Sequence, residues 1–213
     1  SGNVLASAGE DGTVRLWRRG HNEPDNIIRH QGRVFCVVFS GDSQHLVLAT
    51  GCEDGVVRVF DSYGTLIQNF DEHQGQVNAI AWNRNAKPSW DIASASADGT
   101  VRLWQLPKVQ REVKPSIAKS LAVLQSGGTK IWSLDSVPDE PLLIAGTESG
   151  NVILWSGYES MPLGVLDGHH APVWSVSVGP AGSQLWTGGW DGTVRRWDAS
   201  NAEWMHSGFD VYH

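Results

Sequence analysis

Three residues of this chain, His73, Ser94 and Asp98, are of the types that a hydrolase uses to activate a nucleophile. In such a site the histidine takes the proton of the serine hydroxyl, and the carboxylate holds the histidine in place. The same combination returns near the C-terminal end, at His169, Thr187 and Asp191. A nucleophilic site occurs once in a chain, whereas this combination recurs. The recurrence favours a hydrogen-bonded structural clasp over catalysis, so we expect no enzyme.

These residues belong to a thirteen-residue block that occurs five times. The copies begin at Leu5, Leu48, Ile92, Leu143 and Leu185, and their turn glycines are 43, 44, 51 and 42 residues apart. Each block reads as an apolar strand, a two-residue Asp-Gly or Ser-Gly turn and a second strand, because glycine accepts the positive φ of a tight hairpin. A strand-rich period near forty residues is typical of a β-propeller, in which four-stranded blades surround an axis.

Further strand-like runs lie before and after the blocks, and they bring each repeat to four strands. We therefore expect an all-β propeller of four-stranded antiparallel blades, about five of them, in one region that spans residues 1–213. The expected blades cover approximately residues 1–29 (lacking its first strand), 33–71, 76–124, 129–167 and 172–210.

The recurring residues resemble the WD-repeat β-propeller family. Its pattern is a histidine before the first strand, Ser or Thr in the second, Asp at the turn and Trp at the end of the third. The resemblance implies structural clasps at His73, Ser94, Asp98 and Trp104, at His169, Thr187, Asp191 and Trp197, and at His30, Thr50 and Asp54.

Two repeats depart from that pattern. In the clasp of His30, Phe60 replaces Trp and so lacks the indole N–H. The fourth repeat has Gly127, Ala145 and Ser149 at the three polar positions and keeps only Trp155. We expect a weaker fourth blade, because a polar network that is half satisfied is worse than none.

Seven blades are usual in the family that this chain resembles. Five blades, of which the first lacks a strand, predict an incomplete portion of a seven-bladed ring. A closed five-bladed ring is the alternative.

Eleven tryptophans are present, and the repeat accounts for four of them. In the family that the chain resembles, the face with the His-bearing and Asp-Gly turns takes the partner. Contact residues there flank the start of the first strand or precede the turn Asp. The resemblance implies a partner-binding set of Arg33, Phe35, Lys130, Trp132, Trp174 and Trp190. The alternative is that the indoles are core. We expect a non-enzymatic interaction scaffold for a peptide or protein, within a multi-subunit complex.

Basic residues gather in one part of an otherwise acidic chain. The net charge is −7, yet residues 83–130 carry net +5, which leaves −12 elsewhere. In a four-stranded meander, two loops of the third blade bring together Arg84, Lys87, Lys108, Arg111 and Lys114. An RNA- or ribonucleoprotein-associated propeller is therefore the alternative function. A solvated loop is the plainer interpretation, and the acidic total argues against a protein dominated by nucleic-acid binding.

No Cys/His spacing predicts a metal site and no Gly-rich loop predicts a phosphate site, so we expect no cofactor and no small-molecule substrate. No apolar run approaches the ~20 residues that span a bilayer, and no secretory signal opens the chain, so we expect no membrane association. Cys36 and Cys52 read as buried thiols of an intracellular protein, in the cytoplasm or nucleus, with a disulfide between them left open.

Overall fold

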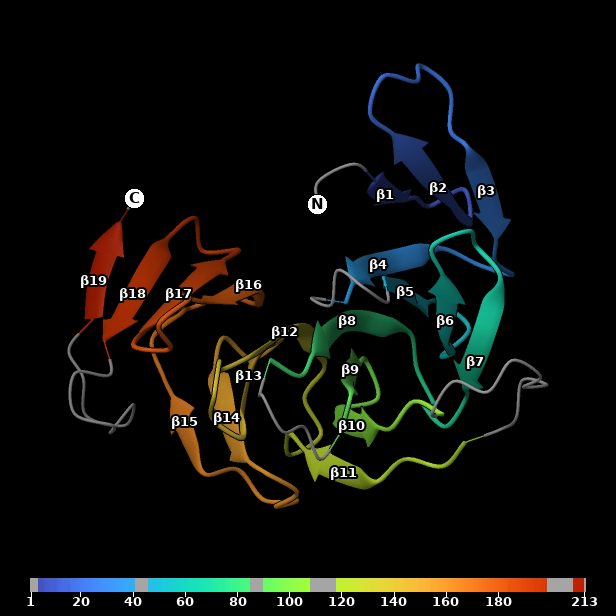
Figure 1. The fold of residues 1–213 in the computed structure, drawn as a ribbon. Coiled ribbons are helices and arrows are strands. Elements are labelled where there is room, and N and C mark those ends of the chain that lie inside the picture. Colours follow the sequence, from blue (N-terminus) through green and yellow to red (C-terminus); the bar gives the residue numbers. More distant parts are fainter. Residues whose placement is uncertain (1–3, 41–45, 85–89, 108–117, 199–208, 213) are drawn as a thin grey trace.

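The computed structural model describes residues 4–40, 46–84, 90–107, 118–198 and 209–212, and all regular elements among them are β-strands. The strands form five antiparallel sheets, four with four strands and one with three (Figure 1). The prediction of an all-β chain built from such blades is confirmed.

Each sheet is one blade, numbered here along the chain. Blade 1 contains β1 (Val4–Ala8), β2 (Thr13–Arg18) and β3 (Asn26–Arg29). Blade 2 contains β4 (Val34–Phe39), β5 (Val47–Cys52), β6 (Val57–Asp61) and β7 (Leu66–Phe70). Blade 3 contains β8 (Val77–Trp82), β9 (Ile92–Ser96), β10 (Thr100–Trp104) and β11 (Ala122–Gln125). Blade 4 contains β12 (Ile131–Ser136), β13 (Leu142–Thr147), β14 (Val152–Ser156) and β15 (Gly164–Leu166). Blade 5 contains β16 (Val173–Val178), β17 (Gln184–Gly189), β18 (Val194–Asp198) and β19 (Phe209–Tyr212), so it extends past the expected boundary at residue 210.

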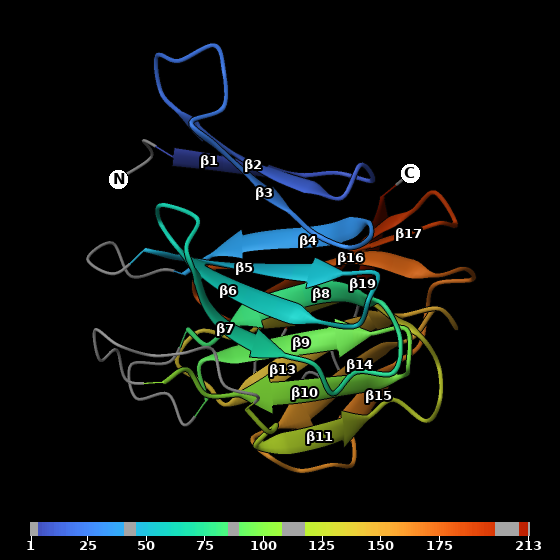
Figure 2. The ribbon, with the colours of Figure 1, turned by 90° about the vertical axis from the view of Figure 1, so that its right-hand side faces the viewer.

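The blades stand side by side in an open arc (Figure 1). The first strands of the complete blades, β4, β8, β12 and β16, line the inner side of the arc. Blades 1 and 5 occupy its two ends, and the side view shows the strands of successive blades running across the molecule (Figure 2). The expected incomplete propeller is therefore confirmed, and a closed five-bladed ring does not describe this arrangement.

The turn glycines also set how closely the blades approach. Gly150, between β13 and β14, has φ of 88°, which is unfavourable for residues with a Cβ. A Cβ at Gly150 would lie 2.5 Å from the carbonyl oxygen of His169, at the start of blade 5. Gly192 in the matching turn of blade 5 has φ of 78°, but an added Cβ would meet nothing within 4 Å among the described residues.

Large apolar side chains between neighbouring blades form the core. Trp104 of blade 3 stacks on Phe70 of blade 2, with ring centroids 4.7 Å apart and planes at 26°. Trp90 and Trp155 are fully buried in the cluster between blades 3 and 4. Burying a large apolar side chain stabilises a fold by about 2 kcal/mol, so these contacts hold the arc together blade by blade.

The outward faces at the two ends of the arc expose apolar side chains. In blade 1, Leu5 is 65% and Ile27 is 42% exposed. In blade 5, Trp186 is 36% exposed on the side of β17 opposite Leu185, which packs against blade 4. Within the described ranges, no further blade covers either face.

Candidate functional site

A chain of hydrogen bonds runs through blade 3 from Trp104 to Asp98. The indole Nε1–H of Trp104 donates to Ser94 Oγ at 2.8 Å, and Ser94 Oγ lies 2.8 Å from His73 Nε2. His73 Nδ1 lies 2.9 Å from Asp98 Oδ2. The bonds join the segment before β8, the strands β9 and β10, and the Asp-Gly turn between those two strands.

Blade 5 contains the same chain. Trp197 Nε1–H donates to Thr187 Oγ1 at 3.0 Å, Thr187 Oγ1 lies 2.8 Å from His169 Nε2, and His169 Nδ1 lies 3.0 Å from Asp191 Oδ2. One proton arrangement satisfies every member: the hydroxyl donates to Nε2, and Nδ1–H donates to the carboxylate. We assign a neutral histidine with its hydrogen on Nδ1 from these partners.

The ionisation of the clasp residues follows from burial and from these bonds. Burial lowers the pKa of His169, although hydrogen bonding to Asp191 opposes that shift. Burial acts to raise the pKa of Asp191, but hydrogen bonds from Thr193, His170 and His169 hold it well below its usual value. The pKa of Asp98 is likewise held low, by His73 and Thr100, against the effect of burial. Each carboxylate is therefore a charged acceptor beside a histidine.

The 2.8 Å distance between Ser94 Oγ and His73 Nε2 would suit a nucleophile and its base, but a substrate has no access to this hydroxyl. Ser94 is fully buried and His73 is 5% exposed. The hydroxyl of Ser94 also receives the indole N–H of Trp104. A substrate cannot reach this oxygen, so the geometry supports a structural clasp.

The predicted clasp of blade 2 is only partly formed. His30 Nε2 lies 2.9 Å from Thr50 Oγ1, but His30 Nδ1 is buried with no partner among the described residues. Asp54 instead receives two bonds from Arg58, of 3.2 and 2.6 Å. The ring of Phe60 meets His30 edge-on at 5.8 Å, and it has no N–H to donate to Thr50 as Trp104 donates to Ser94. The expected grouping of His30 with Asp54 is thus not present in this structure.

Blades 2 and 3 differ in the residue that precedes the histidine. In blade 3 the arginine that matches Arg58 is Arg102, and it pairs with Glu72 at 2.7 Å, which leaves Asp98 to His73. The residue before His30 is Arg29, and Arg58 pairs with Asp54 at 2.6 Å. This residue alone does not decide the pairing, because Gly168 precedes His169 in blade 5 and Asp191 still pairs with His169, with Arg195 3.8 Å away.

The first strand of each complete blade carries a β-bulge near its start. The register with the second strand shifts across the residues that follow Val34, Val77, Ile131 and Val173. The residues passed over are Phe35, Asn78, Trp132 and Trp174. A bulge re-aims its extra side chain, and here it turns the two tryptophans toward the hairpin turns of blades 4 and 5.

Trp132, Trp174 and Trp190 form an aromatic cluster on the face of those turns. The rings of Trp132 and Trp174 are stacked, with centroids 5.7 Å apart and planes at 26°. The rings of Trp174 and Trp190 are 4.5 Å apart and tilted by 60°. Trp174 is 52% and Trp190 is 66% exposed, and Trp132 is half-buried. Exposure on this scale argues against a core role for the cluster.

The three indoles line a hollow of about 260 Å³ together with Glu148 and Pro172, called here the tryptophan hollow. The indole N–H of Trp132 donates to the Glu148 carboxylate. The backbone N–H of Trp190 donates to the Pro172 carbonyl at 2.8 Å. Glu148 and Pro172 are absent from the predicted set, although they occupy the same pre-turn and strand-flanking positions.

The other three predicted partner-binding residues do not line the tryptophan hollow: Lys130 precedes blade 4, and Arg33 and Phe35 lie at the start of blade 2. Lys130 is exposed, and its carbonyl accepts the backbone N–H of Glu148 at 2.9 Å. Phe35 is 37% exposed. The guanidinium of Arg33 lies 3.9 Å from the carboxylate of Glu10. The structure therefore brings three of the six residues together.

Comparison with known proteins identifies the repeat. The model of the WD40 family, described as WD domain, G-beta repeat, matches residues 1–18, 23–61, 64–105, 118–156 and 160–198. The chain belongs to the WD40 family.

Several curated proteins are similar to this WD40 chain. It is 32% identical over 176 residues to Periodic tryptophan protein 2 of Arabidopsis thaliana, which covers 81% of this chain and 18% of that protein. It is 29% identical over 99 residues to Transcription factor unc-37 of Caenorhabditis elegans, covering 46% and 15%. It is 33% identical over 111 residues to Guanine nucleotide-binding protein subunit beta-5b of Danio rerio, covering 52% and 26%. The matches thus span about a quarter or less of each relative's length.

A solved structure supports the fold. The crystal structure of the computationally designed Ika8 protein is similar to this chain with a TM-score of 0.70 and 25% sequence identity. The match covers 93% of this chain and 56% of that chain.

Of the five residues predicted to form a basic face, the structure describes one, Arg84. Arg84 Nη2 lies 2.9 Å from Asp135 Oδ1, and Arg84 Nε lies 3.2 Å from Ser136 Oγ. Arg84 thus links blade 3 to blade 4. The remaining four residues lie outside the described ranges: Lys87, Lys108, Arg111 and Lys114. RNA binding by this face stays a prediction.

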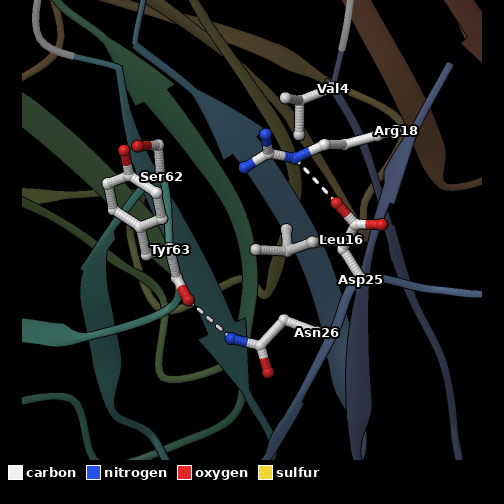
Figure 3. A pocket seen from close by; sticks show the side chains of 7 residues that line it. All are labelled: Val4, Leu16, Arg18, Asp25, Asn26, Ser62 and Tyr63. Carbon is white, nitrogen blue, oxygen red and sulfur yellow. Dashed lines mark hydrogen bonds and ion pairs between the residues drawn. The ribbon is translucent and has the colours of Figure 1, made fainter.

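A second hollow of about 280 Å³ lies between blades 1 and 2 (Figure 3). Its polar groups are paired with one another: Arg18 Nε lies 2.7 Å from Asp25 Oδ2, and Asn26 Nδ2–H donates to the Tyr63 carbonyl at 2.5 Å. The first contact lies within blade 1, and the second joins blade 1 to blade 2.

Three further observations bear on the expected chemistry. Cys36 and Cys52 are free thiols, and burial raises the pKa of Cys36 to about 12, so that thiol is inert at neutral pH. Among the described residues, no three His, Cys, Asp or Glu side chains gather as a metal site would require. In that same part of the chain, no helix is long and apolar enough to cross a membrane.

Proposed function

We propose that this WD40 chain is a non-enzymatic scaffold that binds a peptide or protein partner through the tryptophan hollow, within a multi-subunit complex. The observation that carries the proposal is the cluster of Trp132, Trp174 and Trp190, of which two are more than half exposed. Tryptophan anchors often contribute ~2 kcal/mol or more to an interface. Exposed apolar clusters of this kind are typical of interaction sites.

The hollow is also preorganised for a partner. The Trp132 indole is fixed by Glu148, and the backbone of Trp190 is fixed by Pro172. A side chain that is already ordered loses less conformational entropy when it binds. Lys130, Phe35 and Arg33 would extend the contact surface along the same face.

A pull-down from the native source tests this function. The bait is the chain itself, beside a variant with Trp132→Ala, Trp174→Ala and Trp190→Ala. Trp186→Ala is the matched control, because it removes an exposed indole that does not line the hollow. We expect a partner that the wild type and the control retain and the triple variant loses, with thermal unfolding showing that all three are folded. Equal recovery of every partner by the triple variant would refute the assignment of this face.

We place the protein in a reducing compartment, the cytoplasm or the nucleus, because both cysteines are free thiols. Fluorescence imaging of the tagged protein in its native source checks this placement. Accumulation in a secretory compartment would contradict it.

A further inference from the structure

We infer that the tryptophan hollow receives a cationic side chain, an N-methylated lysine of the partner. This inference rests on the proposed function and specifies which group of the partner the hollow recognises.

The arrangement of the rings favours a cation. Trp174 and Trp190 are tilted by 60°, so their faces do not lie flat on one another and form two walls at an angle. Trp132 is stacked beside Trp174, with ring centroids 5.7 Å apart and planes at 26°, and it also lines the hollow. The face of an indole carries negative electrostatic potential and is the best aromatic surface for an organic cation. Several such faces around one hollow add their attraction.

Charge supports the same guest. Glu148 brings a carboxylate into the lining of the hollow. Glu10 and Glu53 occupy the matching pre-turn positions of blades 1 and 2, and the whole chain carries −7. Lys130 and Arg33 are exposed cations on this face, and Arg33 lies 3.9 Å from Glu10. An acidic protein attracts a basic segment electrostatically, and a segment rich in lysine would supply the guest.

The hydrogen bonds of the lining discriminate among cations. The Pro172 carbonyl and the Glu148 carboxylate each already accept one N–H, from Trp190 and from Trp132, although their other lone pairs remain. The rest of the lining consists of indole side chains, which offer no oxygen acceptor. A primary ammonium brings three N–H donors and a guanidinium brings five, and each unpaired donor is costly away from water. A methylated ammonium keeps the positive charge while replacing N–H donors with methyl groups. It therefore suits a hollow with many aromatic faces and few free acceptors.

The size of the hollow agrees with a single side chain. Pockets for small molecules and cofactors usually enclose ~300–1,000 Å³. The tryptophan hollow, at about 260 Å³, lies just below that range.

A titration with three capped amino acids tests the inference. The ligands are the Nα-acetyl methylamides of trimethyllysine, of lysine, and of the neutral isostere whose trimethylammonium nitrogen is replaced by carbon. Binding is followed through the NMR signals of the indole Nε1–H groups. We expect trimethyllysine to bind at least about ten-fold more tightly than the other two and to shift the signals of Trp132, Trp174 and Trp190.

Variants locate the effect in the hollow. Trp190→Ala removes one wall, and Glu148→Gln removes the charge while keeping an oxygen that can accept the Trp132 N–H. Both variants should bind trimethyllysine several-fold or more weakly than the wild type, whereas Trp186→Ala should bind it with unchanged affinity.

The other outcomes overturn the inference and leave the proposed function to its own test. Equal binding of the neutral isostere would show an apolar pocket with no preference for charge. Equal binding of lysine would remove the preference for methylation. Absence of binding by all three ligands would exclude a lysine-derived guest, while the pull-down still reports whether the face binds a partner.

Discussion

Trp155 and Ala145 lie on neighbouring strands of blade 4 in the same relative positions as Trp104 and Ser94 in blade 3. The indole N–H of Trp155, however, is buried without a partner in the described part of the chain. In blade 3 the serine hydroxyl accepts that hydrogen at 2.8 Å. In blade 4 a methyl group takes its place. Blade 4 therefore carries a buried donor that one oxygen atom could satisfy.

We predict that Ala145→Ser stabilises the fold by about 1 kcal/mol, because the new hydroxyl would accept the Trp155 N–H. Urea unfolding measures the change. Ala49→Ser is the control for adding a hydroxyl at a buried alanine: Ala49 is fully buried in an apolar cluster, where the indole N–H of Trp104 is already donated to Ser94. The control should be destabilised by about 1 kcal/mol. An equal loss in both variants would contradict the expected hydrogen bond.

Ser94→Ala is expected to have the opposite effect in blade 3. The change removes the oxygen between Trp104 and His73 and leaves two buried polar groups unpaired. Each unpaired group costs ~1–3 kcal/mol, so we expect a loss of at least about 2 kcal/mol in the free energy of unfolding.

Ser7→Ala is the comparison for this prediction, because Ser7 occupies the same position in blade 1. Among the described residues, its hydroxyl accepts from Trp17 alone, at 3.0 Å in a solvent-exposed setting. Its loss should stay below about 1 kcal/mol. Similar losses of unfolding free energy for Ser94→Ala and Ser7→Ala would mean that the buried hydrogen bond between Ser94 and His73 contributes nothing.

The sequence predicts those features that depend on neighbours within one repeat. The hairpins follow from Asp-Gly and Ser-Gly turns, and the complete clasps follow from four residues at fixed spacing. The family resemblance predicts Trp174 and Trp190 as rim residues, because they flank the start of a first strand and precede a turn Asp. The structure shows that the strand-flanking position is a β-bulge in each of the four complete blades.

Features that vary between repeats or depend on the adjacent blade were not predictable in this way. Asp54 pairs with Arg58, whereas the matching Arg102 of blade 3 pairs with Glu72, which lies outside the repeat block. Within blade 4, the indole N–H of Trp132 in β12 donates to Glu148 in the β13–β14 turn, a pairing for which the repeat pattern gives no sign. A half-exposed Trp186 likewise depends on what covers blade 5 and not on its own strand.

Acid should destabilise the fold in two stages. The pKa of His169 in the folded state lies below its unfolded value near 6.5, because burial disfavours the charged form. Below about pH 6.5 the unfolded state therefore binds more protons than the folded state, and stability falls as the pH falls. The pKa values of Asp98 and Asp191 are also lower in the folded state, so they add a second loss below about pH 4.

Urea unfolding at pH 7.5, 5.5 and 3.5 measures both stages of this prediction. Asp191→Asn should lower stability at pH 7.5 and reduce the further loss between pH 5.5 and 3.5, because the group that must be protonated is gone. An equal loss of unfolding free energy between pH 5.5 and 3.5 in wild type and variant would show that Asp191 does not contribute to the acid response.

The turn glycines offer a test of how closely the blades pack. Gly150→Ala should destabilise the chain by two separate effects: a residue with a Cβ must adopt φ of 88°, and that Cβ would lie 2.5 Å from the His169 carbonyl. The positive φ alone costs roughly 1–2 kcal/mol. The steric contact must be relieved by moving blade 5 away from blade 4, so we expect a total loss above about 2 kcal/mol.

Gly192→Ala isolates the first effect, because its φ of 78° is similar and its Cβ would meet nothing within 4 Å among the described residues. Urea unfolding should therefore show a smaller loss for Gly192→Ala, about 1 kcal/mol. The tryptophan hollow joins the same two blades, through Glu148 on one side and Trp190 on the other. Gly150→Ala should consequently weaken ligand binding in the hollow more than its matched control does. Equal destabilisation by the two substitutions would mean that blade 5 moves to accommodate the methyl group of Gly150→Ala at no cost in unfolding free energy.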